Sequence, residues 1–510
     1  MKSLYLFLIL LLIGNTIFAQ QKLYNIITYG AKPDAKTNNV LSIQKAIDAA
    51  SANGGGIVLI PAGKFVTGVI NLKSGVDLHL DAKAQLLGST IRADYGVKQA
   101  SALIVASQQH HIAITGKGTI DGQAVELLKD IYKHLQDGTL EDNEWQVYNP
   151  WHQMRPAEAN RPKLIEFINC DDISIKNITI KNGLCWIQNY KNCSNLIIDS
   201  VKVESTTFLN NDGIDLVDCK NVKVTNSFIN AADDGICLKS EDPKGSCEDI
   251  YIANCTIRSS ASAFKLGTAS YGGFKKITVR DIKVYDTFRS AIALESVDGA
   301  VLEDIDIRNV TAKNTGNAIF IRLGQRNKKA DPGKVRRIYI GNVKAEIPSG
   351  KPDKGYSMEG PAVRYPHNVF PSSIVGIPGY PVQDVMLENI EITYRGGAKK
   401  ETAHFGLDSL DKVPENISDY PEFSMFGELP AWGFYIRHAD GIKIKNMTLK
   451  YQKDDFRTAC IFNDVVGLNL NEVKIPTVKT YPVIIFKNAA NPLLKAIQIP
   501  GDSKETIKKL

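Results

Sequence analysis

Beyond its first twenty residues, the 510-residue sequence lacks any hydrophobic run of membrane-spanning length. The opening segment, MKSLYLFLILLLIGNTIFAQ, has one lysine, an apolar stretch and a small residue, Ala19, at a cleavage position. It is too short for a convincing membrane span and predicts a signal peptide over residues 1–19. We therefore expect an exported protein, periplasmic or extracellular, with no membrane span.

The sequence also lacks the charge pattern of a nucleic-acid-binding protein. Its formal net charge is only +6, from 61 basic and 55 acidic residues, and no basic run has aromatic residues between the charges. We therefore expect no nucleic-acid partner, and we interpret the lysines of NVKVTN and IKIKNMTLK as solvated strand faces. Because no CxxC pair exists, a zinc site has little support, and we expect no metal or other cofactor.

Helical periodicity is absent over most of the chain, and a repeat takes its place. CDDISIKN, CSNLIIDS, CKNVKVTN and CEDIYIAN begin at positions 170, 193, 219 and 247, which are 23 to 28 residues apart. Each unit is a short alternating strand, a polar residue and a second short strand. Such units cannot bury their apolar faces alone, but they can when stacked. We therefore predict an all-β fold, a parallel β-helix of a single chain with rungs about 4.8 Å apart.

The eight cysteines allow two interpretations. An even number in an exported chain suggests disulfides. However, the four that open the repeat units should point inward in parallel, and a stack of small buried hydrophobic side chains explains them at least as well.

A second recurring position lies seven residues after each cysteine-type position. It is occupied by Asn177, Ser200, Asn226, Asn254, Asp281 and Asn446. We predict that these side chains form an internal, partly buried ladder that holds one turn of each rung. For this reason we discount most of the glycosylation sequons that NIT, NCT and NMT form.

The N-terminal segment predicts a helix that closes one end of the solenoid. TNNVLSIQKAIDAASANGG is typical of a capped amphipathic helix that ends at glycines 54–56. Terminal units of a solenoid need such caps. We therefore expect residues 20–100 to form the cap and the first rungs.

Residues 101–495 should form the β-helix, followed by a charged tail over residues 496–510. Insertions near 122–162 and 348–436 interrupt the period, and long loops on a rigid scaffold favour the walls of a binding cleft. No linker separates a second domain, so we expect one decorated domain and a monomer.

Three acidic residues stand out. Asp212 lies in NNDGID, and Asp233-Asp234 follow 21 residues later, again before a glycine. Both sets precede a rung, so they should meet on one surface, roughly 5 Å apart. Crowded carboxylates cannot all ionise, so at least one pKa should rise, and a neutral acid beside ionised ones is the pairing that glycoside hydrolysis requires. On spacing alone, simple Asx-Gly turns explain these residues equally well.

Taken together, the motifs resemble glycoside hydrolase family 28, the polygalacturonases and rhamnogalacturonan hydrolases. NNDGID with the later Asp-Asp pair, GKGTIDGQ, RPKLIEFINC and ITYGAKPDAKTNN carry the resemblance, over roughly residues 24–475. The resemblance implies a right-handed parallel β-helix and an inverting hydrolase. It also implies that Asp233 is the general acid, while Asp212 and Asp234 hold and activate water.

Two segments depart from the family. Where the family has Gly-His-Gly, this chain has SSASAFKLGTAS, with Ser262 at the histidine position. Where the family has Arg-x-Lys, SAIALES places Ala293 and Glu295. Because Glu295 would repel a uronate by like charge, we expect a rhamnogalacturonan-like, galacturonate-containing pectic polysaccharide or oligosaccharide rather than plain polygalacturonan.

Polar residues near the acids are candidate substrate contacts. They are Lys265, Asn210, Lys239, Arg289 and Arg322. Lys265 is the preferred one, because it lies at the centre of the departed segment. For the other cations, a solvated strand position is the alternative, since lysine and arginine are mostly exposed.

Two other functions remain open from the sequence. One is a polysaccharide lyase on the same fold, in which the three aspartates bind calcium through hard oxygen ligands. Calcium-dependent formation of unsaturated products would indicate it. The other is a non-catalytic glycan-binding β-helix, for which binding without turnover would persist in an Asp233→Asn variant.

Overall fold

The computed structural model describes residues 22–145, 155–348, 350–356, 370–402, 405–478, 480, 482–501 and 506–510. The predicted signal peptide and parts of both insertions and of the charged tail lie outside these residues. Neither α1 (Val40–Ala52) nor α2 (Ala124–Gln136), nor any other helix in the described part of the chain, has the length and apolar character needed to cross a bilayer.

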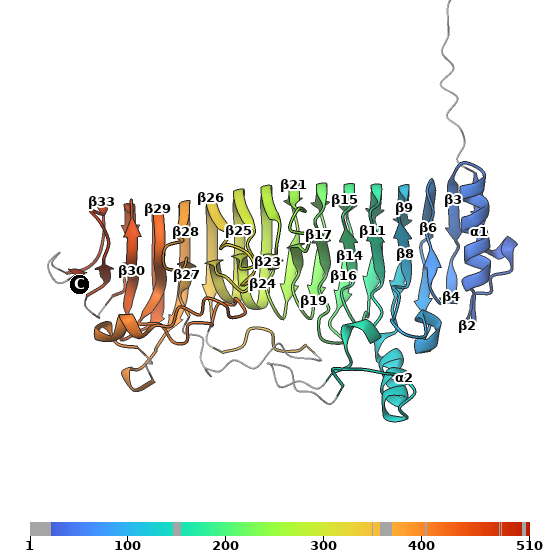
Figure 1. The fold of residues 1–510 in the computed structure, drawn as a ribbon, viewed down its shortest axis with the longest axis horizontal. Helices are drawn as coiled ribbons and strands as arrows, with labels where there is room; N and C mark the ends of the chain where they lie inside the picture. Colours follow the sequence, from blue (N-terminus) through green and yellow to red (C-terminus); the bar gives the residue numbers. More distant parts are fainter. Residues whose placement is uncertain are drawn as a thin grey trace, which may run out of the picture.

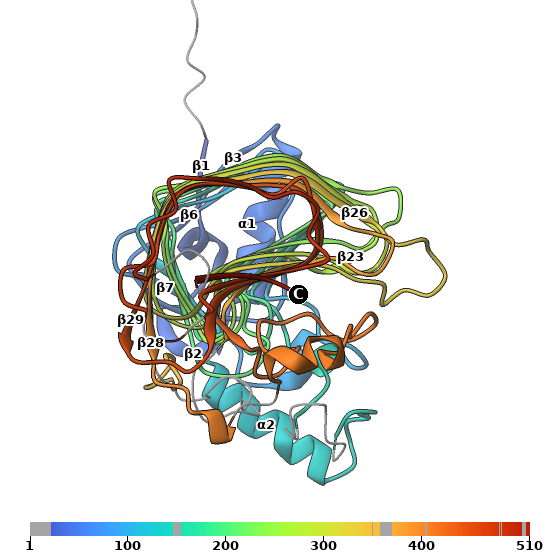
Figure 2. The ribbon, with the colours of Figure 1, turned by 90° about the vertical axis from the view of Figure 1, so that its left-hand side faces the viewer.

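The chain forms a right-handed parallel β-helix, as predicted. Short strands follow one another around a coil, and each pairs in parallel with a strand one turn further along the chain (Figure 1). Viewed from the end, successive coils lie over one another (Figure 2). The pairings divide the strands into three parallel sheets that run the length of the solenoid.

The first sheet contains β1 (Leu23–Asn25), β3 (Gly56–Ile60), β6 (Val76–Leu80), β9 (His110–Gly116), β12 (Asp171–Lys176), β15 (Ser194–Asp199), β18 (Lys220–Thr225), β21 (Cys247–Ala253), β31 (Asn469–Lys474) and β33 (Leu493–Lys495). The second contains β2 (Asp34–Asn38), β4 (Gly63–Thr67), β7 (Ala84–Gly88), β10 (Thr119–Asp121), β13 (Thr179–Lys181), β16 (Lys202–Ser205), β19 (Phe228–Ala231) and β22 (Thr256–Ser259).

The third sheet contains β5 (Ile70–Asn71), β8 (Ile104–Ser107), β11 (Ile165–Ile168), β14 (Gln188–Lys191), β17 (Ile214–Val217), β20 (Ile236–Ser240), β23 (Phe264–Ser270), β27 (Ser372–Val375), β30 (Thr458–Val466), β32 (Ile484–Lys487) and β34 (Ile507–Lys509). Longer strands continue around the corners and join more than one sheet. They are β24 (Gly273–Ser296), β25 (Val301–Leu323), β26 (Lys334–Ile347), β28 (Val382–Gly396) and β29 (Ala431–Lys453).

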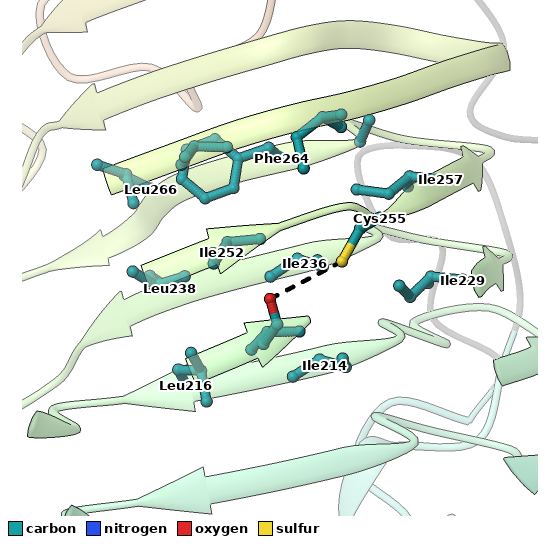
Figure 3. Packing of buried hydrophobic residues seen from close by; sticks show 14 of the residues in the cluster. Ile214, Leu216, Ile229, Ile236, Leu238, Ile252, Cys255, Ile257, Phe264 and Leu266 are labelled. Carbon is teal, nitrogen blue, oxygen red and sulfur yellow. Dashed lines mark hydrogen bonds between the residues drawn. The ribbon is translucent and has the colours of Figure 1, made fainter. Parts of the chain in front are cut away.

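Alternation along each strand fills the interior with apolar side chains. On the third sheet, Ile214, Ile236 and Phe264 are paired in register on successive turns and point inward (Figure 3). All eight cysteines are buried and unpaired. The thiols of Cys219 and Cys247 donate to main-chain oxygens of the preceding turn at 3.1 and 3.3 Å. The structure therefore favours the stack of small buried side chains over disulfides.

The N-terminal helix is present where the sequence predicts it. α1 buries Ile43, Ala46, Ile47 and Ala50 and packs against β1, β3, β5 and β6, closing that end of the solenoid. The 3-10 helices η1 (Ile26–Tyr29) and η2 (Arg92–Tyr95) lie near the same end.

The first insertion, which we expected to be a loop, contains α2. The helix buries Ala124, Leu127, Ile131 and Leu135, a three- and four-residue spacing that was visible in the sequence. The short helix η3 (Glu158–Asn160) follows in the same insertion.

The second insertion packs on the outer face of the third sheet. It contains η4 (Lys400–Thr402) and η5 (Leu407–Lys412). Phe423 and Phe426 join a hydrophobic cluster with the strand residues Phe320, Tyr435 and Ile461. α2 and this segment lie along the same side of the solenoid (Figures 1 and 2).

The recurring polar ladder exists, but it lies outside the solenoid and not inside it. All six predicted positions are exposed and have positive φ, between 52° and 62°. In this left-handed conformation, which Asn and Asp tolerate best, the side chain leaves the corner toward solvent. Asn446 Nδ2, for example, donates to Asn389 Oδ1 at 2.7 Å. The prediction of a buried ladder was therefore wrong, and burial gives no reason to discount the sequons.

Asn342→Ala should destabilise the protein by about 2 kcal/mol, because two ladder bonds and a residue suited to positive φ are lost together. Asn342 (φ 55°) donates to Asn309 at 2.9 Å and accepts from Asn389 at 2.8 Å. Thermal unfolding measures the loss as a lower melting temperature. Glu346→Ala, at another exposed position on β26, is the control and should stay within about 0.5 kcal/mol of the parent. Equal melting of both variants would contradict a stabilising ladder.

Candidate active site

The structure brings the three predicted acids together at the start of the third-sheet strands. Asp212 precedes β17, and Asp233-Asp234 precede β20, the paired strand on the next turn. The main-chain N–H of Gly213 donates to the carbonyl of Asp234 at 2.9 Å. One carboxylate oxygen each of Asp212 and Asp234 lies within 4.8 Å of the other.

The glycines that follow these acids let successive turns approach closely. A Cβ on Gly213 would lie 2.6 Å from the carbonyl oxygen of Gly235. One on Gly235 would lie 2.7 Å from that of Ala263. Because real Cβ atoms do not come so near, the Asx-Gly pairs are required for the stacking that places one acid above another.

Lys239 lies against Asp212. This lysine, on β20, is 8% exposed. Its Nζ donates to Asp212 Oδ2 at 2.8 Å and contacts Asp215 Oδ1. The Trp186 ring centroid is 4.1 Å from Lys239 Nζ. Burial favours the neutral amine, but the two aspartates outweigh it and raise the pKa of Lys239 well above its ordinary value. Lys239 is therefore a buried cation engaged with acids, not a solvated strand lysine.

Lys265 stands in the same relation to Asp234. It is 2% exposed on β23, and its Nζ donates to Asp234 Oδ2 at 3.0 Å. Glu295 Oε2 lies 3.9 Å from this Nζ, and the Tyr420 hydroxyl accepts from it at 3.1 Å. Burial opposes the charge of Lys265, but Asp234 and the other acidic neighbours raise its pKa well above the ordinary value.

Asp234 is consequently held as a carboxylate. Burial alone would raise its pKa, but Lys265, Arg289 and Lys239 together lower it below the ordinary value. The main-chain N–H of Ser262 also donates to Asp234 Oδ1 at 2.9 Å. Ser262 thus contributes a backbone donor to this carboxylate.

Asp233 differs from the other two acids in both environment and access. Asp212 and Asp234 are each 4% exposed, whereas Asp233 is half-buried. Within the described part of the chain, no lysine or arginine forms a salt bridge with Asp233. Its desolvated position and the neighbouring charges of Asp212 and Asp234 raise its pKa to about 7. The site therefore combines an accessible neutral acid with two buried acids that are paired with lysines, and this combination can support general acid–base chemistry.

Two further buried acids belong to the cluster, and sequence reasoning did not identify their place there. Asp215 is fully buried on the outer side of β17, and burial followed by the charge of Asp212 raises its pKa well above the ordinary value. Glu295 is 2% exposed and accepts from Thr268 at 3.3 Å, and burial raises its pKa to about 7. Glu295 thus does not carry the full negative charge that the sequence argument assumed. Both side chains occupy outward positions on strands of the third sheet. This alternation with inward apolar residues is the sequence signal that could have identified them.

Of the other predicted contacts, Arg289 lies close enough to Asp233 and Asp234 to lower their pKa values, whereas Asn210 is bonded to the first insertion. Arg289 is 6% exposed, and its guanidinium carbon lies 5.7 Å from the Tyr420 ring centroid. Asn210 Oδ1 accepts from Arg161 at 2.9 Å, beside the first insertion.

The prediction that Arg322 contacts substrate requires correction. Its side chain is fully buried. Its guanidinium donates to the main-chain oxygens of Gly376 and Glu415 at 2.9 and 2.7 Å. These bonds fasten the second insertion to the third sheet, so Arg322 belongs to the scaffold.

Both insertions reach the neighbourhood of the acids. Tyr420, 40% exposed, comes from the second insertion and contacts Lys265. On the other side, Arg161 from the first insertion donates to the main-chain oxygens of Leu184 and Leu209 at 3.0 and 2.7 Å. His438, on β29, bonds Glu415 at 3.1 Å and Asp464 at 2.6 Å.

Asp212, Asp234 and Cys237 are grouped closely enough to consider a metal ion. The donors do not suit calcium, which takes six to eight oxygen ligands. Both carboxylates already accept from lysine ammonium groups, and burial raises the pKa of the Cys237 thiol well above its ordinary value. We therefore derive no step through a cation here.

Solved structures of low sequence identity share this fold. The family 28 exopolygalacturonase of Yersinia enterocolitica aligns with a TM-score of 0.59 and 18% identity, covering 95% of this chain and 79% of that one. The hyperthermoactive exopolygalacturonase of Thermotoga maritima aligns with a TM-score of 0.56 and 22% identity, covering 73% and 87%.

Curated relatives are similar over part of their length. The exo-poly-alpha-D-galacturonosidase of Dickeya chrysanthemi is 26% identical over 388 residues, which is 65% of this chain and 63% of that protein. A Vitis vinifera protein named "Probable polygalacturonase" is 27% identical over 338 residues, 60% of this chain and 64% of that protein. The chain thus spans slightly under two thirds of the length of these relatives.

The sequence model described as "Glycosyl hydrolases family 28" matches residues 53–354, more than half of the chain, and includes all three acids and both lysines of the site. The resemblance identified from the motifs is confirmed: the protein belongs to family 28 of the glycosyl hydrolases.

Proposed function

We propose that the protein is an exported glycoside hydrolase that cleaves pectic polysaccharide or oligosaccharide by an inverting acid–base mechanism. The observation that carries the proposal is the division of the three acids. Asp212 and Asp234 each accept from a buried lysine, whereas Asp233 does not and has a pKa near neutrality. Membership of the family and the pectin-cleaving activities named for its relatives support the same class of reaction.

In the proposed mechanism, the neutral acid donates a proton and the two ionised acids activate water. Asp233, half-buried and neutral below about pH 7, donates its proton to the oxygen of the leaving sugar. Asp212 and Asp234 act as carboxylates that orient a water molecule and accept its proton as it attacks the anomeric carbon. Inversion follows because water attacks directly, from the face opposite to the leaving group.

For the substrate, we favour a rhamnogalacturonan-like glycan over plain polygalacturonan. Among the described residues, the cations nearest the acids are Lys239, Lys265 and Arg289, and none is more than 8% exposed. Both lysine ammonium groups are already engaged with carboxylates. Ala293 and Glu295 supply no cation either. A neutral sugar on one side of the scissile bond fits this arrangement better than a uronate. The names of the relatives favour polygalacturonan, so a test of this preference requires both substrates.

Asp233→Asn should lower the rate of hydrolysis at least about a hundredfold, because the proton for the leaving oxygen is lost. Mass spectrometry of products from rhamnogalacturonan and polygalacturonan oligosaccharides measures this for the parent and the variant. We expect saturated, shortened products from the parent, with rhamnogalacturonan fragments preferred.

The matched control is Asp218→Asn. Asp218 is 5% exposed at the end of β17, and it accepts from Ser240 at 2.6 Å and from two main-chain N–H groups at 3.0 Å. Its replacement should lower stability and keep the rate per folded molecule. Unsaturated products would indicate a lyase. A parent protein that binds either substrate but cleaves neither would contradict the hydrolase proposal.

The rate should depend on pH with two limbs. Activity falls above about pH 7, where Asp233 loses its proton. It also falls in acid, where Asp234 gains a proton, and this happens at a lower pH than for an ordinary aspartate because its pKa is lowered. Lys265 lowers the pKa of both acids, so Lys265→Gln should move both limbs of the kcat/KM profile to higher pH. If the alkaline limb of the variant's profile moves to lower pH, or if both limbs stay at the same pH, Lys265 does not set the ionisation of these acids.

A further inference from the structure

Lys239 is held from three directions, and only one of its partners is among the predicted catalytic acids. Its Nζ donates to Asp212 Oδ2 at 2.8 Å, contacts Asp215 Oδ1, and lies 4.1 Å from the centre of the Trp186 ring. An ammonium group has three N–H donors, so these contacts account for all of them. Lys239 is therefore fixed in position and is not available to a substrate.

Asp215 is bonded to Lys239. It is fully buried, its Oδ1 contacts the ammonium group, and the carboxyl of Asp212 lies beside it. Among the described residues, Asp215 Oδ2 has no other hydrogen-bond partner. Burying a carboxyl group costs free energy unless it is paired. Among the described residues, Lys239 is the cation that bonds Asp215 and so compensates this cost.

Trp186 lies on the turn before Asp212. The main-chain N–H of the adjacent Ile187 donates to the carbonyl of Asp212 at 2.9 Å, which fixes the two turns relative to each other. The indole ring is partly buried beside Lys239, and partial desolvation strengthens the cation–π contact.

We propose that Asp215 and Trp186 are positioning residues that act through Lys239 to hold the carboxylate of Asp212 for the attacking water. The proposal rests on the proposed hydrolase function. Asp215 and the Trp186 ring keep the ammonium group between them, so that its third N–H points at Asp212. When either is removed, the ammonium group can turn toward Asp234, whose ionisation it also influences, and Asp212 loses its orientation.

Asp215→Asn tests the proposal without a large change in volume. We expect kcat to fall about tenfold to a hundredfold, the range for losing a hydrogen bond to a charged group, while KM changes less than about threefold. Asp218→Asn, directly after the same strand but bonded to residues 240–242, is the matched control and should keep kcat. Thermal unfolding of both variants separates lost stability from lost positioning.

Two further variants test the route through Lys239. Trp186→Leu should lower kcat about tenfold, whereas Trp186→Phe, which keeps an aromatic ring, should stay within about threefold of the parent. In a Lys239→Met background, Asp215→Asn should change kcat less than about twofold, because the effects of substitutions that act through the same group do not add. If Asp215→Asn keeps the parent kcat, or if its effect persists in full in the Lys239→Met background, the positioning role is wrong. A parent protein that cleaves neither glycan would instead overturn the hydrolase proposal and the positioning role with it.

Discussion

The placement of two lysine ammonium groups among five buried or half-buried carboxyl groups is the interaction on which the site depends. The acids are Asp212, Asp215, Asp233, Asp234 and Glu295, and the lysines are Lys239 and Lys265. Carboxyl groups this close cannot all be ionised without cations between them. Because each ammonium group contacts one acid of the 212/234 pair, Asp233 is the one of the three predicted catalytic acids that is left to carry a proton. The assignment of a general acid thus follows from where the lysines lie.

A parallel β-helix is suited to this arrangement because its register is repeated from turn to turn. An acid at the start of one strand and a lysine on the outer side of the next strand approach within hydrogen-bond distance, since adjacent strands are about 4.8 Å apart. Each lysine follows its acid in the sequence and lies one turn further along the solenoid. Lys239, the partner of Asp212, lies on β20, which pairs with β17. Lys265, the partner of Asp234, lies on β23, which pairs with β20. The Asx-Gly turns allow the close stacking, and the exposed ladder at the corners fixes the same register from outside.

The sequence predicts the periodic parts of this structure well. Rungs, the capping helix and the meeting of Asp212 with Asp234 depend on local alternation and on one repeat length, both of which are visible in a single chain. The direction of the ladder was mistaken, because alternation along a strand does not determine where a side chain points from a left-handed corner. α2 was missed because its apolar spacing lies in an otherwise polar insertion.

Contacts that join distant segments could not be predicted. Tyr420 reaches Lys265 from 155 residues away, and Arg322 donates to carbonyl oxygens of the second insertion, so neither role is encoded in a repeat. The same holds for Glu295, whose burial beside Lys265 changes its charge from what an isolated glutamate would carry. Such contacts depend on how an irregular segment packs, and a hydrophobic cluster fixes that packing here.

Neutron diffraction from deuterium-exchanged crystals at mildly acidic pH tests the central claim most directly, because it locates the protons themselves. The account predicts deuterium on the carboxyl group of Asp233, three deuterons on each of Lys239 and Lys265, and none on Asp234. A deprotonated Asp233 beside a protonated Asp234, or a neutral amine at either lysine, would contradict it.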